Sequence, residues 1–192
     1  PERIFTLTGS TLRLFGRESI GSWFEQTLVA RRQEHHRYRA ETEVFFEPAA
    51  FQQAAGLTTY YNRHKFHFLA VTWHETAGRC LTILSCPGEW PDGRLSFPLA
   101  APQPLPDEGP VRLAVEVKGA EQQFFYSTGG RWQPIGPVLD AGATSDEAGR
   151  GAHGSFTGTF VGMMCFDTSG GGRAADFTRY GPPPGGPPAG RW

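Results

Sequence analysis

The sequence contains almost no lysine: its 18 basic residues are arginines except for Lys65 and Lys118, and its net charge is −1 over 192 residues. A chain with so little excess charge lacks the electrostatic footprint of proteins that bind nucleic acid or an anionic membrane. No apolar run approaches the ~20 residues that a helix needs to cross a bilayer. We therefore predict neither a nucleic-acid partner nor a membrane partner. The apolar content of 39% predicts a folded chain and not a disordered one.

Cysteine is also scarce, with three residues at positions 80, 86 and 165. An odd count argues against a complete disulfide framework. Cys80 and Cys86 belong to one predicted strand, and an extended chain would hold them roughly 20 Å apart, far beyond disulfide reach. We expect buried free thiols in a reducing compartment, which predicts a cytoplasmic location.

Metal-binding patterns are missing as well. The sequence has neither a Cys-x-x-Cys nor a His-Glu-x-x-His spacing. His64 and His67 differ by an odd number across a predicted turn, so their side chains should point apart. Asp140, Asp146 and Glu147 lack the alternating ligand pattern of a calcium loop and are predicted to be turn and capping residues. We therefore predict no metal site and no cofactor.

The pattern that is present is that of β-structure. Strands are predicted over 39–46, 57–61, 65–74, 79–86, 111–118, 122–127, 159–166 and 175–180, with one short helical segment over 48–53. Residues 65–74 carry apolar side chains on both faces, which predicts a central strand. So many short strands at hairpin spacing predict an all-β fold, a jelly-roll sandwich of two antiparallel sheets.

Domain organisation follows from the distribution of proline and glycine. Residues 87–110 form a predicted surface loop with one short strand at Leu95–Phe97. The Pro/Gly-rich stretch 181–192 cannot build a core and is predicted to be a disordered or polyproline-like tail. We predict a single domain over 1–180 and no internal repeat.

Phe156 has the most informative local setting, because Gly154 and Gly158 flank it just before an apolar strand. Glycines permit a sharp turn and remove side chains that would cover the ring. The ring can then project outward as a flat surface for a sugar or a partner, although it could also plug the end of the core. Trp90, in a Pro/Gly loop, and Trp23, between strands, are candidates for sugar stacking, whereas Trp132 is predicted to cover an edge of the core.

Two carboxylates could also form a glycosidase site. Glu41 and Glu43 lie on one face of a predicted strand at roughly the separation that a pair of catalytic carboxylates requires. The Glu-x-Asp-x-x-Glu pattern of sandwich endoglucanases is missing, so we predict that these side chains are a solvated strand face.

Several segments together resemble one family. They are 24–33; 40–48 with 51–57 and 60–62; 132–140 with 145–147; and 154–163 followed by Cys165, Asp167, Ser169 and 175–177. This ordered set, spanning about residues 3–180, resembles the C-terminal concanavalin-A-like sandwich of bacterial β-xylosidases of glycoside hydrolase family 43. Many of those enzymes also cleave α-L-arabinofuranosides.

The resemblance implies a division of labour. In that family the catalytic carboxylates lie on a separate N-terminal β-propeller, so no catalytic residue is expected in this chain. The sandwich would pack on the propeller, and an aromatic residue, matched here by Phe156, would close the sugar pocket. Such a lid excludes water and favours exo-acting hydrolysis of short xylo-oligosaccharides. The parent enzyme is expected to be a homo-oligomer.

Three hypotheses remain open on the residues alone. The first is this accessory domain with Phe156 as a pocket lid. The second is a stand-alone carbohydrate-binding module for xylan-type sugars that uses Trp90, Trp23 or the pair Tyr60 and Tyr61. The third is a sandwich glycosidase that uses Glu41 or Glu43. The absence of an initiator Met before Pro1 favours an excised domain over a stand-alone relative.

Overall fold

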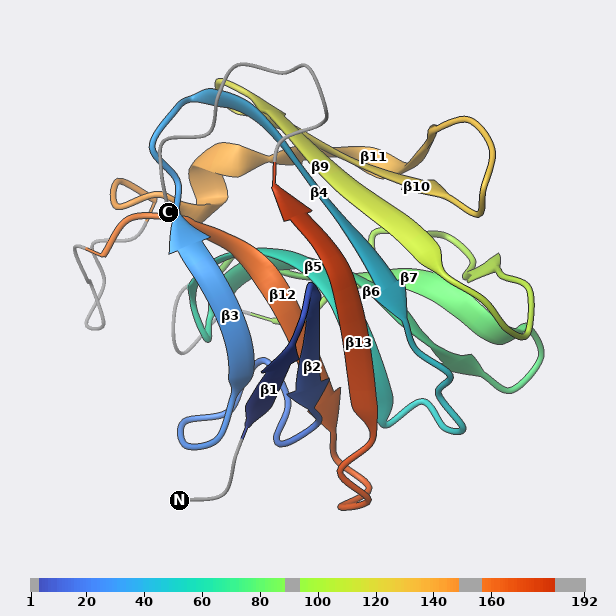
Figure 1. Cartoon of the computed structure of the whole chain (residues 1–192). Coiled ribbons are helices and arrows are strands. Elements are labelled where there is room, and N and C mark those ends of the chain that lie inside the picture. Colours follow the sequence, from blue (N-terminus) through green and yellow to red (C-terminus); the bar gives the residue numbers. More distant parts are fainter. Residues whose placement is uncertain (1–3, 89–93, 149–156, 182–192) are drawn as a thin grey trace.

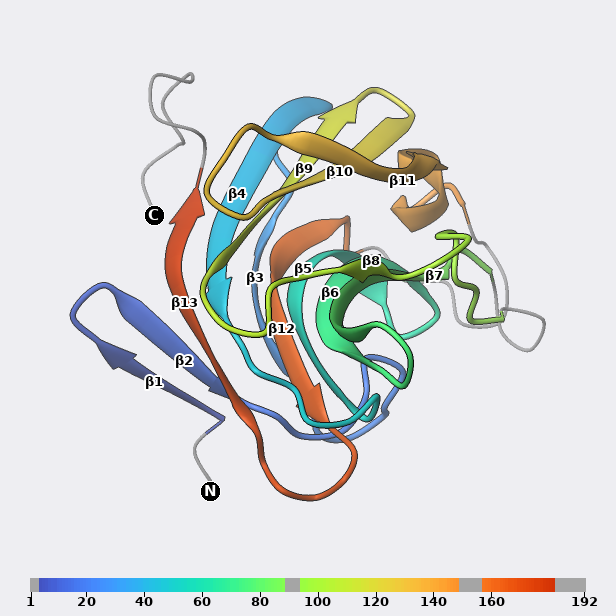
Figure 2. The same cartoon turned by 90° about the vertical axis from the view of Figure 1, so that its right-hand side faces the viewer.

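The computed structural model describes residues 4–88, 94–148 and 157–181, and these form two antiparallel sheets packed face to face (Figures 1 and 2). In spatial order the seven-stranded sheet contains β1 (Phe5–Thr8), β2 (Thr11–Phe15), β13 (Ala174–Gly181), β4 (Arg37–Phe45), β9 (Val111–Lys118), β10 (Glu121–Ser127) and β11 (Gln133–Asp140). The six-stranded sheet contains β3 (Thr27–Arg32), β12 (Phe160–Asp167), β5 (Gln53–Asn62), β6 (Lys65–His74), β7 (Gly78–Cys86) and β8 (Gln103–Pro104). The predicted two-sheet sandwich is confirmed.

The main core fills the space between the sheets. Leu113 and Val115 of β9 and Leu69 and Val71 of β6 belong to this one core cluster, and all four side chains are fully buried. Alternation places one face of each strand in this layer, as expected for packed sheets.

The outer face of the six-stranded sheet is apolar too. Phe68 and Ala70 of β6 and Met164 of β12 point away from the main core, yet all three are fully buried. The segment 16–26 supplies their cover through Ile20, which is 3% exposed and belongs to the same cluster. The prediction that residues 65–74 form a central strand, apolar on both faces, is confirmed.

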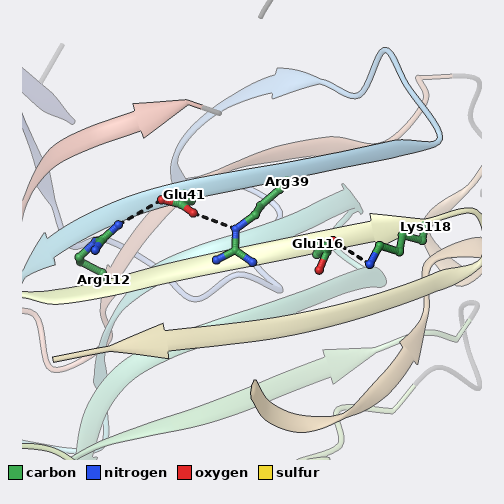
Figure 3. A network of polar contacts seen from close by, with 5 residues as sticks. All are labelled: Arg39, Glu41, Arg112, Glu116 and Lys118. Carbon is green, nitrogen blue, oxygen red and sulfur yellow. Dashed lines mark hydrogen bonds and ion pairs between the residues drawn. The ribbon is translucent and has the colours of Figure 1, made fainter. Parts of the chain in front are cut away.

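The outer face of the seven-stranded sheet carries charge instead. Figure 3 shows Glu41 of β4 between Arg39 and Arg112, at 2.8 and 3.3 Å, and Lys118 beside Glu116 at 2.9 Å. These side chains stand on the strand positions that alternate with the core residues. Their side-chain exposure ranges from 12% for Glu41 to 57% for Lys118, so this charged face keeps partial contact with water.

A buried arginine fastens the long segment after β7. Arg79, which is 2% exposed, donates hydrogen bonds to the carbonyl oxygens of Phe46 at 2.9 Å, Pro106 at 2.7 Å and Gly109 at 2.7 Å. Burial lowers the pKa of the guanidinium, and Glu47 and Asp107 oppose that shift. The contacts join β7 to the ends of two other segments without a disulfide.

Some predictions about elements were wrong. Residues 48–53 form a turn and not a helix, because the chain must reverse there from β4 into β5. Leu95–Phe97 is not a strand: Ser96 makes one isolated bridge to Ser85. The strands β1, β2, β3, β8 and β11 were not predicted. Strand β13 extends to Gly181, the first residue assigned to the tail, whereas residues 182–192 lie outside the described ranges.

The remaining sequence-based expectations concern thiols, metals and membranes. Cys80, Cys86 and Cys165 are buried and free, and burial raises the pKa of each thiol. Among the described residues, no group of three or more His, Cys, Asp or Glu side chains could hold a metal ion. Within the same ranges no helix is long and apolar enough to span a membrane.

Candidate functional site

The candidate loops leave one end of the six-stranded sheet. Phe160, the first residue of β12, pairs with Tyr60 of β5 and with Arg32 of β3, while Phe66 of β6 pairs with Cys86 at the end of β7. The segment that carries Phe156 leads into β12, and the segment with Trp90 follows β7 at the same end of the sheet, with β5 and β6 between those two strands. Phe156 and Trp90 themselves lie outside the described residues. We call this edge of the sheet the loop end.

A β-bulge in β5 positions the first anchor of the loop end. The register between β5 and β6 shifts between Tyr60 and Asn62, which leaves Tyr61 as the extra residue. A bulge redirects the side chain that it carries. The Tyr61 hydroxyl donates to Asp146 Oδ1 at 2.7 Å, and the same oxygen accepts the backbone N–H of Gly158 at 3.2 Å. One carboxylate thus ties together both sides of the segment that contains Phe156.

Two further hydrogen bonds fix the stems of that segment. Thr159 donates its hydroxyl to the carbonyl oxygen of Thr144 at 2.6 Å, and Gln33 donates its backbone N–H to the carbonyl oxygen of Thr159 at 2.8 Å. Gly158 has φ +71°, a left-handed conformation that L side chains rarely adopt. In Figure 1 the 3₁₀-helix η1 (Ala141–Thr144), the start of β12 and the arrowhead of β3 accordingly lie together at the upper left.

A buried histidine of β6, His67, links that strand to β7 and to the residue that precedes η1. His67, which is 2% exposed, has Nδ1 2.8 Å from Ser85 Oγ and Nε2 3.2 Å from the carbonyl oxygen of Asp140. Burial lowers the pKa of His67, although its contact with Asp140 opposes the shift. Asp140 caps η1, because its Oδ1 accepts the N–H of Gly142 at 2.8 Å. The predicted capping role of Asp140 is confirmed.

Trp23 also lies near the loop end. Its ring is 64% exposed, and its centroid is 6.0 Å from that of His64 in an edge-on contact. The guanidinium carbon of Arg63 lies 3.9 Å from the centroid of the same ring, a short cation–π distance. Trp23 is thus an exposed aromatic ring held against the β5–β6 turn.

The two tyrosines suggested for sugar stacking serve the fold instead. Tyr60 is half-buried, stacks on Phe66 with centroids 6.5 Å apart, and donates its hydroxyl to Gln26 at 2.9 Å. Tyr61 is buried beneath Asp146, as described above. Neither ring offers a free face to a sugar.

The two glutamates do not form a catalytic pair. Glu41 and Glu43 line an open hollow of about 400 Å³ together with Arg112 and Arg179. Both carboxylate oxygens of Glu41 face guanidinium groups, and Glu43 accepts a hydrogen bond from Thr178 at 2.8 Å. A glycosidase needs two carboxyl groups that both face the scissile bond, whereas arginines hold both carboxylate oxygens of Glu41 and Thr178 bonds Glu43. The prediction of a solvated strand face fits this geometry.

Trp132 differs from its predicted place. It was expected to cover an edge of the core, but it packs on the outer face of the seven-stranded sheet. The guanidinium carbons of Arg39 and Arg112 lie 4.8 and 4.5 Å from its ring centroid, and Arg39 also lies 4.9 Å from that of Phe125. Its neighbours are thus the charged residues of Figure 3.

Comparisons with known proteins were made for the sequence and for the structure. The family described as the β-xylosidase C-terminal concanavalin A-like domain matches residues 1–180. Xylosidase/arabinosidase 43B of Humicola insolens is 48% identical over 182 residues, which are 93% of this chain and 34% of that protein. A β-xylosidase of Bacillus subtilis is 43% identical over 171 residues, or 88% of this chain and 31% of that protein.

A solved structure gives the same result for the fold. The crystal structure of a xylan β-1,4-xylosidase from Bacillus halodurans superposes with a TM-score of 0.83 at 39% identity, covering 88% of this chain and 32% of that one. This chain therefore spans about a third of the length of the relatives that it matches.

Proposed function

Because this chain belongs to the family of β-xylosidase C-terminal concanavalin A-like domains, we propose that it is the accessory sandwich of a glycosidase whose catalytic residues lie on another domain. The partner would be the β-propeller expected from glycoside hydrolase family 43. The occupied oxygens of Glu41 support this proposal, because they leave the best carboxylate pair in the described residues unsuited to acid catalysis.

Phe156 would close the sugar pocket of that partner. The observation that carries this role is the pair of fixed stems: Asp146 bonds Tyr61 and Gly158, and Thr159 bonds Thr144. A residue that excludes water from a pocket must be held in place before substrate arrives. Tyr61 of β5, Thr144 of η1 and Gln33 after β3 hold these stems, so an aromatic residue between them would extend from a rigid base.

The substrate we propose is a short xylo-oligosaccharide, hydrolysed from its end. The relatives support this proposal, because they include a xylosidase/arabinosidase and a β-xylosidase. We further propose a homo-oligomeric parent enzyme and, from the three buried free thiols, a reducing cytoplasmic location.

A carbohydrate-binding module for xylan-type sugars is the second candidate. The 64% exposure of Trp23 favours it, because exposed aromatic side chains are the usual stacking partners of sugar rings. In this case the isolated chain would bind xylan fragments by itself.

The test uses a chimera of the Humicola insolens relative in which this chain replaces the matching third of the sequence. We expect the chimera to hydrolyse p-nitrophenyl β-D-xyloside and Phe156→Ala to lower kcat/KM at least about tenfold, a loss typical of a positioning contact. Phe156→Tyr should retain most activity. Phe51→Ala is the matched control, because Phe51 is 71% exposed in the turn at the other end of β5.

The isolated chain separates the alternatives. We expect it to show no turnover of the xyloside and no binding of xylohexaose by calorimetry. Turnover by the chain alone would return attention to Glu41 and Glu43. Binding that Trp23→Ala abolishes would favour the carbohydrate-binding module.

A further inference from the structure

The exposed aromatics of the segment 16–26 are held in place by their own segment. Trp23 is 64% exposed and Phe24 is 86% exposed. Ser22 accepts the N–H of Phe24 at 3.0 Å and donates its own N–H to the carbonyl oxygen of Ser19 at 3.0 Å, while Gln26 donates to the carbonyl oxygen of Ser22 at 3.0 Å. Ile20 fastens the segment to the apolar face beneath it. A hydrogen-bonded turn therefore holds the two rings in exposed positions.

Arg63 stacks against the ring of Trp23, with its guanidinium carbon 3.9 Å from the ring centroid. Its Nε and Nη1 are buried and have no hydrogen-bond acceptor among the described residues. No ion pair of Arg63 is found within the described ranges. Arg63 as a whole is only partly buried, so a carboxylate on a docking body can pair with the guanidinium from its solvent side.

The cluster formed by Trp23, Phe24 and Arg63 lies next to the loop end. The edge contact between Trp23 and His64 joins the segment 16–26 to the β5–β6 turn. Tyr61, three residues before His64, reaches Asp146, which in turn binds Gly158. A body that packs over the stems of the Phe156 segment would therefore meet the two exposed rings as well.

We propose that Trp23, Phe24 and Arg63 form a docking surface for the catalytic domain, in which an apolar patch of that domain covers both rings and a carboxylate pairs with Arg63. The inference rests on the proposed accessory function and adds the surface that would carry the domain contact. Trp and Arg are the residues most often found as energetic anchors of protein interfaces. The catalytic domain is the expected partner of this surface, because about two thirds of each relative's length lies outside the part that matches this chain.

A sugar fits the same cluster less well. Arg63 covers one face of the Trp23 ring and His64 meets its edge, which limits the room for a sugar ring to stack there. The adjacent Phe24 is more exposed than Trp23 and extends the apolar surface. An apolar patch of a protein domain can cover both rings.

The experiment measures binding separately from catalysis. The whole 192-residue chain is titrated by calorimetry into the catalytic fragment of the Humicola insolens relative, and hydrolysis of p-nitrophenyl β-D-xyloside is followed at saturation. We expect Trp23→Ala, Phe24→Ala and Arg63→Gln each to raise Kd at least about tenfold, the usual range for interface anchors. Trp23→Phe should be milder, and Phe51→Ala should leave Kd unchanged. Added salt should weaken wild-type binding more than that of Arg63→Gln.

The outcomes separate this inference from the proposed function. Wild-type affinity in all three variants, each checked for an unchanged melting temperature, would overturn the docking surface and leave the accessory function intact. Absence of both binding and activation by the wild-type chain would contradict the accessory function itself. Xylohexaose binding that is lost in Trp23→Ala, or a dimer of this chain that the same substitution dissociates, would assign the cluster to a sugar or to a second copy and overturn the proposal.

Discussion

The outward faces of the two sheets differ sharply although strand alternation produces both. On the seven-stranded sheet the outward residues are charged, and Arg39, Glu41 and Arg112 form ion pairs in contact with water. On the six-stranded sheet the outward residues include Phe68 and Met164, which are fully buried. The segment 16–26 lies over the second face and leaves the first one open.

The two outer faces contribute differently to stability and to the exposure of Trp23. An exposed ion pair contributes about 0–1 kcal/mol, whereas burial of a large apolar side chain contributes roughly 1.5–3 kcal/mol. The apolar outer face also fixes the segment that displays Trp23. We therefore expect substitutions on the six-stranded face to affect folding and docking together, and those on the seven-stranded face to affect neither strongly.

The largest effect is expected for Phe68→Ala. Phe68 is 0% exposed and its ring lies 6.2 Å from that of Phe166, so truncation leaves a cavity in the second cluster. The free energy of unfolding should fall by about 3–5 kcal/mol. Urea denaturation measures this change. Phe125→Ala, on the half-exposed opposite face, is the matched control, and an equal loss in both variants would remove the distinction between the faces.

The next effect is expected for Ile20→Ala. Ile20 is the buried contact of the segment 16–26, and its truncation should cost about 2–4 kcal/mol. The segment should also open locally more often than the strands beneath it. Hydrogen exchange of the Glu18 and Ser22 amides, which bond within the segment, would reveal this opening. Exchange that accelerates equally in β6 would show that the segment and the sheet unfold as one unit.

A smaller effect, dependent on pH, is expected from His67. Burial lowers its pKa in the folded protein, so the unfolded chain binds the proton more readily. The stability that depends on neutral His67 is complete above the unfolded pKa of about 6.5 and declines as the pH falls toward the folded value. Chemical denaturation between pH 7.5 and 5 should show this decline, and His67→Asn should reduce it. An unchanged slope in that variant would assign the pH dependence to other groups.

The smallest effect is expected for Glu41→Gln. Glu41 loses two ion pairs, but Arg39 and Arg112 remain in contact with water and with Trp132. Unfolding free energy should change by less than about 1 kcal/mol, and the chimera should retain its activity. A loss of xyloside hydrolysis in this variant would revive the sandwich-glycosidase hypothesis.

Alternation in the sequence predicted the central strands well. The predicted ranges 65–74 and 111–118 coincide with β6 and β9, because both strands alternate regularly and end at turn residues. Strand β11 was missed, since Pro134, Gly136 and Pro137 disfavour a strand in isolation. An edge strand tolerates proline because one side of it has no partner. The edge position of β11 in the folded sheet thus outweighed the low strand propensity of its proline and glycine residues.

The candidate site was only partly accessible to sequence reasoning. The place of Glu41 and Glu43 on the outer face of a strand could be predicted from alternation, whereas the role of Phe156 stays a prediction. The contact of Tyr61 with Asp146 could not, because it joins residues 85 positions apart and depends on a bulge without a sequence signature. The stacking of Arg63 on Trp23 likewise joins distant segments that only the folded sheet brings together.

Arg79 has a consequence for how the long segment after β7 responds to its surroundings. A cation enclosed by the carbonyl oxygens of Phe46, Pro106 and Gly109 resembles the coordination of a structural calcium ion. Here the cation is covalently part of the chain, so no chelator can remove it and no dilution can dissociate it. The attachment of residues 105–109 to the sandwich should therefore withstand changes in calcium concentration that would loosen a loop held by a bound ion.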